Sequence, residues 1–296
     1  MAASILIPRT LRGSIIRTTF YPIPFPHTRR HTTSQIPQKS SWKHPTYTKD
    51  HITAVEPAHR KPDTWQDRVA LQKVRFLRRG MDFATGYRSS GPTTILNEDM
   101  TEEKWLRRFI FLESVAGVPG MVAGMLRHLK SLRQMRRDNG WIETLLEEAY
   151  NERMHLLTFL QLAQPTPLMR FMVLGAQCVF FTGFSVAYLI SPQICHRFVG
   201  YLEEEAVITY SKAIRDLDNG RLPRWESLRA PDMAVRYWEM PVDQRCMRSL
   251  LLYVRADEAK HCEVNHTLGD LDQNLDLNPF SVRVEQMRKG EVKAEL

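Results

Sequence analysis

The chain has 296 residues, 43% of them hydrophobic, and a formal net charge of +8 from 41 Lys and Arg against 33 Asp and Glu residues. Eight of the basic residues and none of the acidic ones fall within residues 1–49, so the rest of the chain holds 41 − 8 = 33 basic and 33 acidic residues. That neutral remainder lacks the basic excess of a nucleic-acid-binding protein, and we predict no nucleic-acid partner.

The basic N-terminal segment is rich in Ser and Thr and lacks acidic residues. This composition is typical of a mitochondrial transit peptide, which we place at residues 1–43; an uncleaved disordered tail is the alternative. The four cysteines show neither disulfide-like nor Cys-x-x-Cys spacing, which suits a reducing compartment; they are Cys178, Cys195, Cys246 and Cys262.

Three segments follow the presequence. Residues 44–100 are polar and weakly periodic and form an arm, with one helix expected near 64–79. Residues 101–268 carry helical apolar periodicity, and residues 269–296 form a polar tail. Gly and Pro signals interrupt the helical part at residues 138–140, 164–167, 191–192 and 218–220. Because strand-like alternation and sequence repeats are not evident, the pattern predicts an all-α fold.

The motif Glu-x-x-His occurs four times, as Glu56/His59, Glu152/His155, Glu258/His261 and Glu263/His266. A short motif of this kind is weak evidence until its helical context is known. The first copy contains Pro57 in a stretch without apolar periodicity, so we interpret it as incidental. The last copy follows the third by five residues, a rotation of about 140° on a helix, so we expect it to face solvent.

Four predicted helices each carry a carboxylate within an apolar face, and two of them add a histidine one turn later. Any one of these residues alone could be a rim carboxylate or a core histidine. Together their order is that of a ferritin-like four-helix bundle holding two metal ions. A shared cation would remove the several kcal/mol that a buried, unpaired carboxylate costs. The candidate ligands are Glu113, Glu152, His155, Glu203, Glu258 and His261.

The chemistry of this ligand set narrows the metal. Carboxylates with two imidazoles suit iron or manganese, whereas structural zinc sites use closely spaced Cys pairs, which this sequence lacks. The residues alone leave iron and manganese open. The sequence therefore predicts a pair of iron or manganese ions as the cofactor inside the bundle.

Two further apolar helical faces raise the question of a membrane. Residues 171–190 contain no charge and are long enough to span a bilayer, and residues 109–126 are also strongly apolar. A spanning helix about 30 Å long would place His155 and Glu203, which flank it, on opposite sides of the membrane. Because both belong to one predicted site, we expect in-plane, monotopic attachment to one leaflet. A true span and a merely buried helix pair are the alternatives.

Four longer motifs resemble the signature boxes of the alternative oxidases, the cyanide-insensitive ubiquinol oxidases of mitochondria. They are FLESVAGVPG (111–120), NERMHL (151–156), FVGYLEEEAV (198–207) and RADEAKH (255–261), and the resemblance covers residues 101–268. It implies two iron ions held by the six candidate ligands and reduction of O2 to water by ubiquinol without proton pumping. It also implies a homodimer attached to the matrix-facing leaflet of the mitochondrial inner membrane.

The resemblance further implies roles for individual residues. Tyr210 matches a tyrosine proposed as a radical or proton-coupled electron donor; a core tyrosine bonded to a ligand is the alternative. The quinol pocket would comprise Arg108, Leu112, Glu205, Ala206 and Thr209. Asn151 and Asp257, next to two ligands, would orient them, and the other family-like polar positions are Trp141, His196, Tyr237 and Trp238. Small departures from the family pattern occur at Ser114 and Cys262.

Four competing interpretations share part of this pattern. A di-iron quinone hydroxylase would use the same ligands but insert oxygen into the ring. A plastid terminal oxidase would perform the same chemistry in another organelle. A ferritin-like iron-storage or ferroxidase protein would need a soluble shell, which the two uncharged helical faces disfavour. A metal-free structural bundle would leave the buried carboxylates uncompensated.

Overall fold

The computed structural model describes residues 44–85, 87 and 100–281. The predicted presequence and the end of the predicted C-terminal tail lie outside the described residues, and both remain predictions. The described elements are the helices α1 (Lys49–Thr53), α2 (Trp65–Thr85), α3 (Glu102–Gln134), α4 (Trp141–Leu160), α5 (Pro167–Ile190), α6 (Pro192–Asp218), α7 (Pro223–Glu226), α8 (Asp232–Tyr237) and α9 (Met247–Asp270), and the 3-10 helix Val242–Gln244. Among these residues there is no β-strand, only one isolated bridge, so the all-α prediction is confirmed.

The helix boundaries follow the turn signals of the sequence. Thr166 caps α5 by accepting a hydrogen bond from a backbone N–H, and Pro167 follows in the first turn. Ser191 and Pro192 do the same for α6. Prolines suit this position because the first N–H groups of a helix have no intrahelical partner. Between α3 and α4 the backbone turns through Gly140, whose φ of 81° lies in the left-handed region that glycine tolerates.

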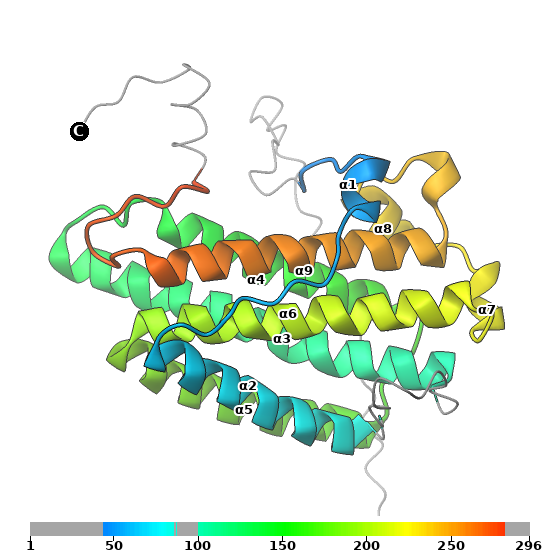
Figure 1. Cartoon of the computed structure of the whole chain (residues 1–296), viewed down its shortest axis with the longest axis horizontal. Helices are drawn as coiled ribbons and strands as arrows, with labels where there is room; N and C mark the ends of the chain where they lie inside the picture. Colours follow the sequence, from blue (N-terminus) through cyan, green and yellow to red (C-terminus); the bar gives the residue numbers. More distant parts are fainter. Residues whose placement is uncertain (1–43, 86, 88–99, 282–296) are drawn as a thin grey trace, which may run out of the picture. The chain divides into compact units, whose positions relative to one another are not determined.

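Helices α3, α4, α6 and α9 form the predicted four-helix bundle (Figure 1), in which α3 packs closely on α4 and α6 on α9. Outside the bundle, α2 packs on α6, and α5 packs mainly on α3. Stacked aromatic rings fill one end of the core, with Phe109 4.7 Å from Tyr210 and 5.0 Å from Phe159 between ring centroids. The bundle therefore holds its four helices at fixed distances around a common interior.

The two apolar helical faces differ in burial. Both α3 and α5 are long and apolar enough to cross a membrane, but the apolar window is 50% buried in α3 and only 11% buried in α5. The segment 109–126 is therefore half core, whereas 171–190 is almost entirely surface. Helix α2, which extends six residues beyond its expected end, adds an exposed apolar stripe that includes Trp65, Phe76 and Phe83.

Helix α3 approaches α4 closely at Gly120, where an added Cβ would lie 2.6 Å from the carbonyl oxygen of Leu145. We predict that Gly120→Ala lowers the free energy of unfolding by about 1–3 kcal/mol, because the two backbones must separate. In α5, a Cβ on Gly175 meets no atom within 4 Å, so Gly175→Ala should leave stability unchanged or raise it by up to about 1 kcal/mol. Chemical denaturation of both variants measures this; equal stabilities would contradict the close approach.

Candidate metal centre

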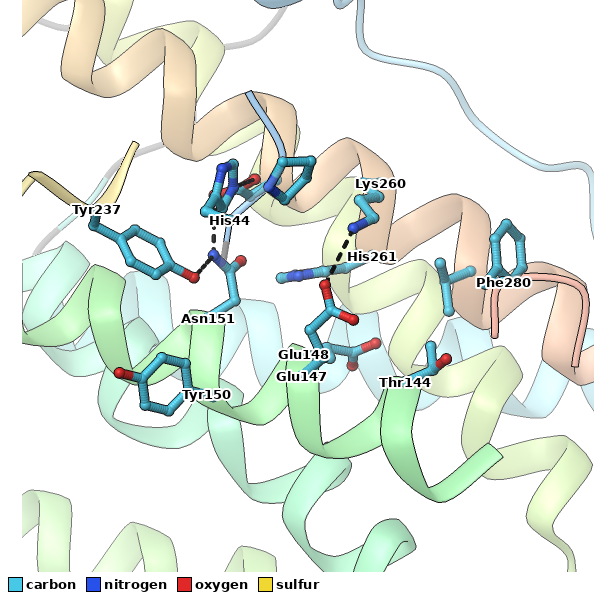
Figure 2. Close-up of a pocket in the computed structure, with 13 residues that line it drawn as sticks. His44, Thr144, Glu147, Glu148, Tyr150, Asn151, Tyr237, Lys260, His261 and Phe280 are labelled. Atoms are coloured by element: carbon cyan, nitrogen blue, oxygen red, sulfur yellow. Dashed lines mark hydrogen bonds and ion pairs between the residues drawn. The ribbon is translucent and has the colours of Figure 1, made fainter. Parts of the chain in front are cut away.

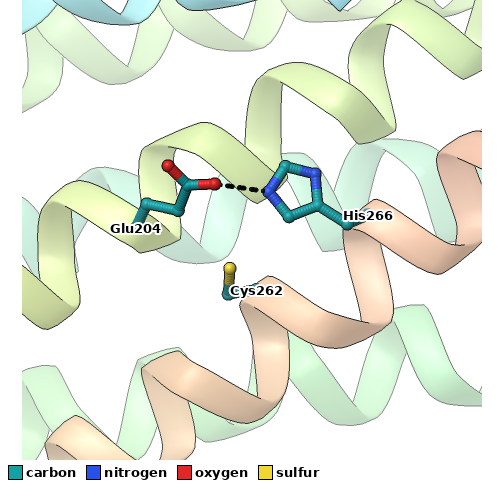
Figure 3. A group of neighbouring side chains, drawn as sticks. All are labelled: Glu204, Cys262 and His266. Atoms are coloured by element: carbon teal, nitrogen blue, oxygen red, sulfur yellow. Dashed lines mark hydrogen bonds and ion pairs between the residues drawn. The ribbon is translucent and has the colours of Figure 1, made fainter. Parts of the chain in front are cut away.

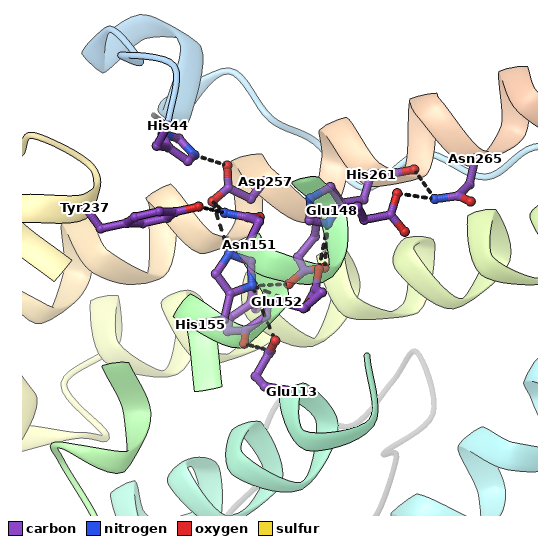
Figure 4. Close-up of polar contacts among 12 residues, drawn as sticks. His44, Glu113, Glu148, Asn151, Glu152, His155, Tyr237, Asp257, His261 and Asn265 are labelled. Atoms are coloured by element: carbon purple, nitrogen blue, oxygen red, sulfur yellow. Dashed lines mark hydrogen bonds and ion pairs between the residues drawn. The ribbon is translucent and has the colours of Figure 1, made fainter. Parts of the chain in front are cut away.

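The structure brings all six predicted ligands together inside the bundle. Figure 4 labels four of them, Glu113, Glu152, His155 and His261. They form two overlapping groups, in each of which the ligand atoms lie within 4.8 Å of one another. Glu152 of α4 and Glu258 of α9 belong to both groups. Glu113 of α3 and His155 complete one group, and Glu203 of α6 and His261 complete the other. All six side chains are buried, so the site lies in the interior where the four helices meet.

Both histidines turn the same ring atom toward the carboxylates. Nδ1 of His155 lies 3.2–3.4 Å from oxygens of Glu113, Glu152 and Glu258. Nδ1 of His261 lies 2.7 Å from Oε1 of Glu152 and 4.0 Å from Oε2 of Glu258. Two imidazole nitrogens and a set of carboxylate oxygens thus converge on one small volume.

Several of these converging atoms make no hydrogen bond to the described residues, although they lie within ion-pair distance of one another. They are Oε2 of Glu113, both carboxylate oxygens of Glu152, Oε1 of Glu258 and Nδ1 of both histidines. Buried polar atoms are nearly always satisfied in folded proteins, because leaving them unpaired costs about 1–3 kcal/mol each. A carboxylate-rich donor set with two imidazoles fits iron or manganese ions. The residues present therefore fit a pair of such cations.

The six candidate ligands strongly affect one another's pKa values. Burial and then the charge of Glu258 raise the pKa of Glu113 well above its usual value, and the same two causes act on Glu203. Burial alone would lower the pKa of His261, but the carboxylate of Glu152 more than offsets it and raises that pKa to about 9. Burial opposes the charge on Glu152 as well, yet the two histidines hold its pKa below the usual range. Metal ions would have to displace the bound protons.

Asp257 contacts the ring nitrogen of His155 that points away from the candidate ligands, and so orients the ring. Nε2 of His155 lies 3.1 Å from Oδ2 of Asp257, and the same oxygen accepts hydrogen bonds from Asn151 (3.1 Å) and from Trp238 (2.9 Å). Asn151 also donates to the hydroxyl of Tyr237 at 2.8 Å. An Nε2–H donated to a carboxylate leaves the Nδ1 lone pair directed at the ligand cluster, the arrangement that metal-binding histidines commonly adopt.

Two other polar positions highlighted by the sequence lie further out. His196 bonds the hydroxyl of Tyr188 (3.2 Å) and Oδ1 of Asn265 (3.1 Å), and burial lowers its pKa to about 4. The amide of Asn265 in turn donates to the backbone carbonyl of His261, so His196 touches the centre only indirectly. Trp141 donates its indole N–H to a backbone carbonyl of the C-terminal segment and makes no hydrogen bond to the six ligands.

Sequence reasoning missed one acidic residue of the centre, Glu148. It lies four residues before Glu152 on α4, hence on the same helical face, and that spacing was the signal that could have found it. Burial raises its pKa to about 7, and it accepts a hydrogen bond of 2.8 Å from Asn265. With His261 and Lys260 it lines a cavity of about 50 Å³ on the side of the centre that faces the N-terminal arm (Figure 2).

Tyr210 follows Glu203 by seven residues on α6 and contacts the edge of the centre. Its fully buried hydroxyl donates a short hydrogen bond to Oε1 of Glu113. Burial and the charge of Glu113 raise the pKa of Tyr210 well above its usual value, so the phenol keeps its proton. The structure thus gives a protonated tyrosine in contact with a candidate ligand, an arrangement shared by both interpretations of this residue.

An apolar cavity of about 860 Å³ leads to the centre between α2, α3, α5 and α6. Glu113, Glu203 and Glu258 lie at its inner end. Leu112 and Ala206, two of the five expected quinol contacts, line its wall. The volume is within the range of pockets that bind drug-sized molecules, and its lining suits an apolar ring.

The other three expected quinol contacts lie beside this cavity, outside its wall. Arg108 is buried, donates to Oδ1 of Asp82 at 2.7 Å and lies 4.6 Å above the ring of Tyr87. Glu205 forms an ion pair with Arg78 of α2. The hydroxyl of Thr209 donates to the backbone carbonyl of Glu205 at 2.8 Å. Two residues of α2, Asp82 and Arg78, thus pair with Arg108 and Glu205 outside the apolar wall, and the sequence offered no local sign of these contacts.

A second group of potential ligands, Glu204, Cys262 and His266, lies on the outer side of α6 and α9 (Figure 3). Glu204 belongs to neither group of the centre. Its carboxylate oxygens bond Nε2 of His266 (2.9 Å) and Nδ1 of His59 (2.6 Å). Nδ1 of His266 accepts a hydrogen bond from Arg197, so Nε2 carries the proton that is given to Glu204. These donors are already satisfied, and the group anchors the arm to α6.

The expectation that Glu263 and His266 face solvent is half wrong. Glu263 is exposed, but His266 is buried against α6 over Gly200, where an added Cβ would lie 2.6 Å from the imidazole. The rotation of about 140° carries His266 away from the metal centre and onto the neighbouring helix. Glu56 is exposed, whereas His59, the other half of the motif interpreted as incidental, contacts Glu204.

Comparison with known proteins agrees with this geometry. The profile of the family described as "Alternative oxidase" matches residues 47–270. A mitochondrial alternative oxidase of Emericella nidulans is 66% identical over 82% of this chain and 70% of its own length. That of Aspergillus niger is 60% identical over 95% of this chain and 79% of its own, and that of Neurospora crassa 50% identical over 96% and 86%. The chain belongs to the alternative oxidase family.

Proposed function

We propose that this protein is a cyanide-insensitive ubiquinol oxidase that reduces O2 to water at a di-iron centre in mitochondria. The observation that carries the proposal is the set of six buried candidate ligands, five of which have atoms without a hydrogen-bond partner among the described residues, beside an apolar cavity that three of them line. When bound, two iron ions supply O2 binding and transfer of single electrons. The mitochondrial names of the fungal relatives and the basic presequence support the location.

The ligands divide into three roles. Glu152 and Glu258 belong to both groups of ligand atoms and would contribute to holding both ions. Glu113 with His155, and Glu203 with His261, would each serve one ion. Tyr210 holds a proton on a hydrogen bond to Glu113, which suits donation of a proton and an electron toward the centre.

The cavity supports ubiquinol as the reductant. Its apolar walls, including Leu112 and Ala206, suit the quinol ring and tail, and a ring bound in it would lie beside the three candidate ligands that line it. Two quinols supply four electrons and four protons, which convert one O2 into two waters. Because protons would be released and consumed at one site, we propose no proton pumping. Arg108, Glu205 and Thr209 form a polar group next to the cavity that is suited to holding a quinol oxygen once the ring is bound.

Helices α5 and α2 support attachment to the matrix-facing leaflet of the inner membrane. Phe171 and Val179 of α5 are 74% and 76% exposed, and Phe76 of α2 is 71% exposed. Exposed basic residues of α2, such as Arg75 and Arg79, suit lipid phosphates. Both helices line the cavity, so a quinol could enter it from the lipid. The half-buried α3 contributes less to this face than its sequence suggested.

The outer face of α3 supports the homodimer that the family resemblance implies. Met121, Met125, Leu129 and Leu132 follow one helical stripe and are 37–60% exposed. Contact of such an exposed apolar stripe with another protein surface is more favourable than its contact with water. We propose that a second copy of the chain covers it.

The purified wild-type protein should oxidise ubiquinol with an oxygen uptake that cyanide does not inhibit. The Glu152→Gln variant should lose both its bound iron and this activity. This change removes the carboxylate shared by both halves of the centre, so we expect iron content and oxidation to fall together by at least about 100-fold. The matched control, Glu263→Gln, alters an exposed residue of α9 and should match the wild type. Cyanide-resistant oxidation in Glu152→Gln, or a hydroxylated quinone as the product, would refute the proposed reaction.

Iron binding to the apo protein should release protons near pH 7. The pKa of His261, which the carboxylate of Glu152 raises to about 9, means that this imidazole holds a proton there. Metal ligation requires the unprotonated form, and the raised pKa values of Glu113 and Glu203 act in the same direction. Iron affinity should therefore rise with pH up to about 9. Calorimetric titration of Fe(II) in buffers of different ionisation enthalpy measures the released protons; an affinity independent of pH would contradict the predicted protonation.

Membrane attachment predicts that carbonate extraction leaves the protein in the mitochondrial membrane pellet. Protease added from the intermembrane-space side should cut nothing, because the chain lies in one leaflet. The double variant Phe171→Glu, Val179→Glu places charges on the exposed face of α5 and should move the protein into the supernatant. Cleavage from both sides would demonstrate a spanning helix instead.

A further inference from the structure

The beginning of the described arm lies against the hydrogen-bond network behind His155. Nε2 of His44 donates to Oδ1 of Asp257 at 2.7 Å, and the hydroxyl of Tyr47 donates to the same oxygen at 2.8 Å. The side chains of His44 and Asp257 are only 4% and 2% exposed. These contacts join residues more than two hundred positions apart.

The two oxygens of Asp257 serve different parts of the protein. Oδ1 receives both hydrogen bonds from the arm, whereas Oδ2 receives those from the bundle, including the one from Nε2 of His155. Figure 4 shows His44 and His155 on opposite sides of this carboxylate. Because a carboxylate is rigid and planar, fixing Oδ1 also fixes the direction in which Oδ2 accepts.

We propose that His44 and Tyr47 are positioning residues of the metal centre, which hold Asp257 so that His155 keeps Nδ1 directed at the metal. The inference rests on the proposed function, since it takes His155 as an iron ligand. The arm then has a part in the reaction although it contributes no ligand of its own.

Packing around the arm fixes the two donors. The ring of His44 lies 5.1 Å from that of Tyr237 and 6.0 Å from that of Trp238, both of which belong to the same network. Tyr47 stacks on Tyr253 of α9 at 6.4 Å.

The small cavity beside the centre shows what the arm excludes. His44 and Pro45 line it together with Asn151, Asp257 and His261 (Figure 2). If the arm were absent, water would reach Oδ1 of Asp257 and compete for its hydrogen bonds. A water has no fixed orientation there, whereas His44 and Tyr47 approach from a rigid aromatic cluster.

The test compares His44→Ala and Tyr47→Phe with His51→Ala in the full-length, iron-loaded protein. His51 lies exposed on α1, so its variant should match the wild type. We expect each of the first two to lower kcat per bound iron about 10-fold with KM for ubiquinol unchanged, and to alter the EPR signal of the partly reduced iron pair. His44→Gln keeps a side-chain N–H donor and should recover part of the lost kcat.

Two results would overturn the inference. One is wild-type kcat per iron and an unchanged EPR signal in His44→Ala and Tyr47→Phe. The other is a loss of thermal stability alone, with normal turnover by the remaining iron-loaded protein, which would make the arm merely structural. A wild-type protein without iron-dependent quinol oxidation would instead refute the proposed function itself, before any variant is compared.

Discussion

Charge balance at the buried centre is the constraint on which the rest of this structure depends. Four carboxylates and two imidazoles from four helices converge within a few ångströms, in an interior where uncompensated charge is costly. Protons can balance these charges only if the pKa values of Glu113 and His155 lie well above their usual values. Two divalent cations would do so without such shifts, so the same groups that destabilise an empty bundle would tie its helices together when metal is bound.

The surroundings of the centre are asymmetric, and the asymmetry follows from the reaction proposed for it. On the α2 and α5 side lies a large apolar cavity, suited to a lipid-soluble reductant. On another side, Asp257 and Glu148 line a small cavity, each with its own hydrogen bonds, and the arm covers Asp257. Electrons would thus reach the ligands from one side while hydrogen bonds fix the ligands from the other. Neither side could perform the other's task, since an apolar wall cannot orient an imidazole.

Helical phase and the Glu-x-x-His motif together predicted the six candidate ligands, because the helices that carry them have apolar stripes whose period is visible in the sequence. Tyr210 follows Glu203 by seven residues and so shares its helical face. Phase could not reveal partners supplied by another segment. Arg108 is bonded to Asp82 of α2 and lies outside the cavity wall. Asp257 is bonded to His44 of the arm. In both cases the two segments share no sequence pattern that would predict the contact. Helical phase could also have predicted Glu148, since it shares a helical face with Glu152.

Close helix packing sets the distances at the centre. An added Cβ on Gly117 would lie 3.3 Å from the carbonyl of Ala149 and 3.5 Å from Cβ of Glu152, so this glycine brings α3 against α4 beside a ligand. Gly200 similarly admits His266 between α6 and α9. These are the two helix pairs that carry the ligands. A metal centre tolerates displacements of only a few tenths of an ångström, so residues that bind nothing determine whether the ligands can meet.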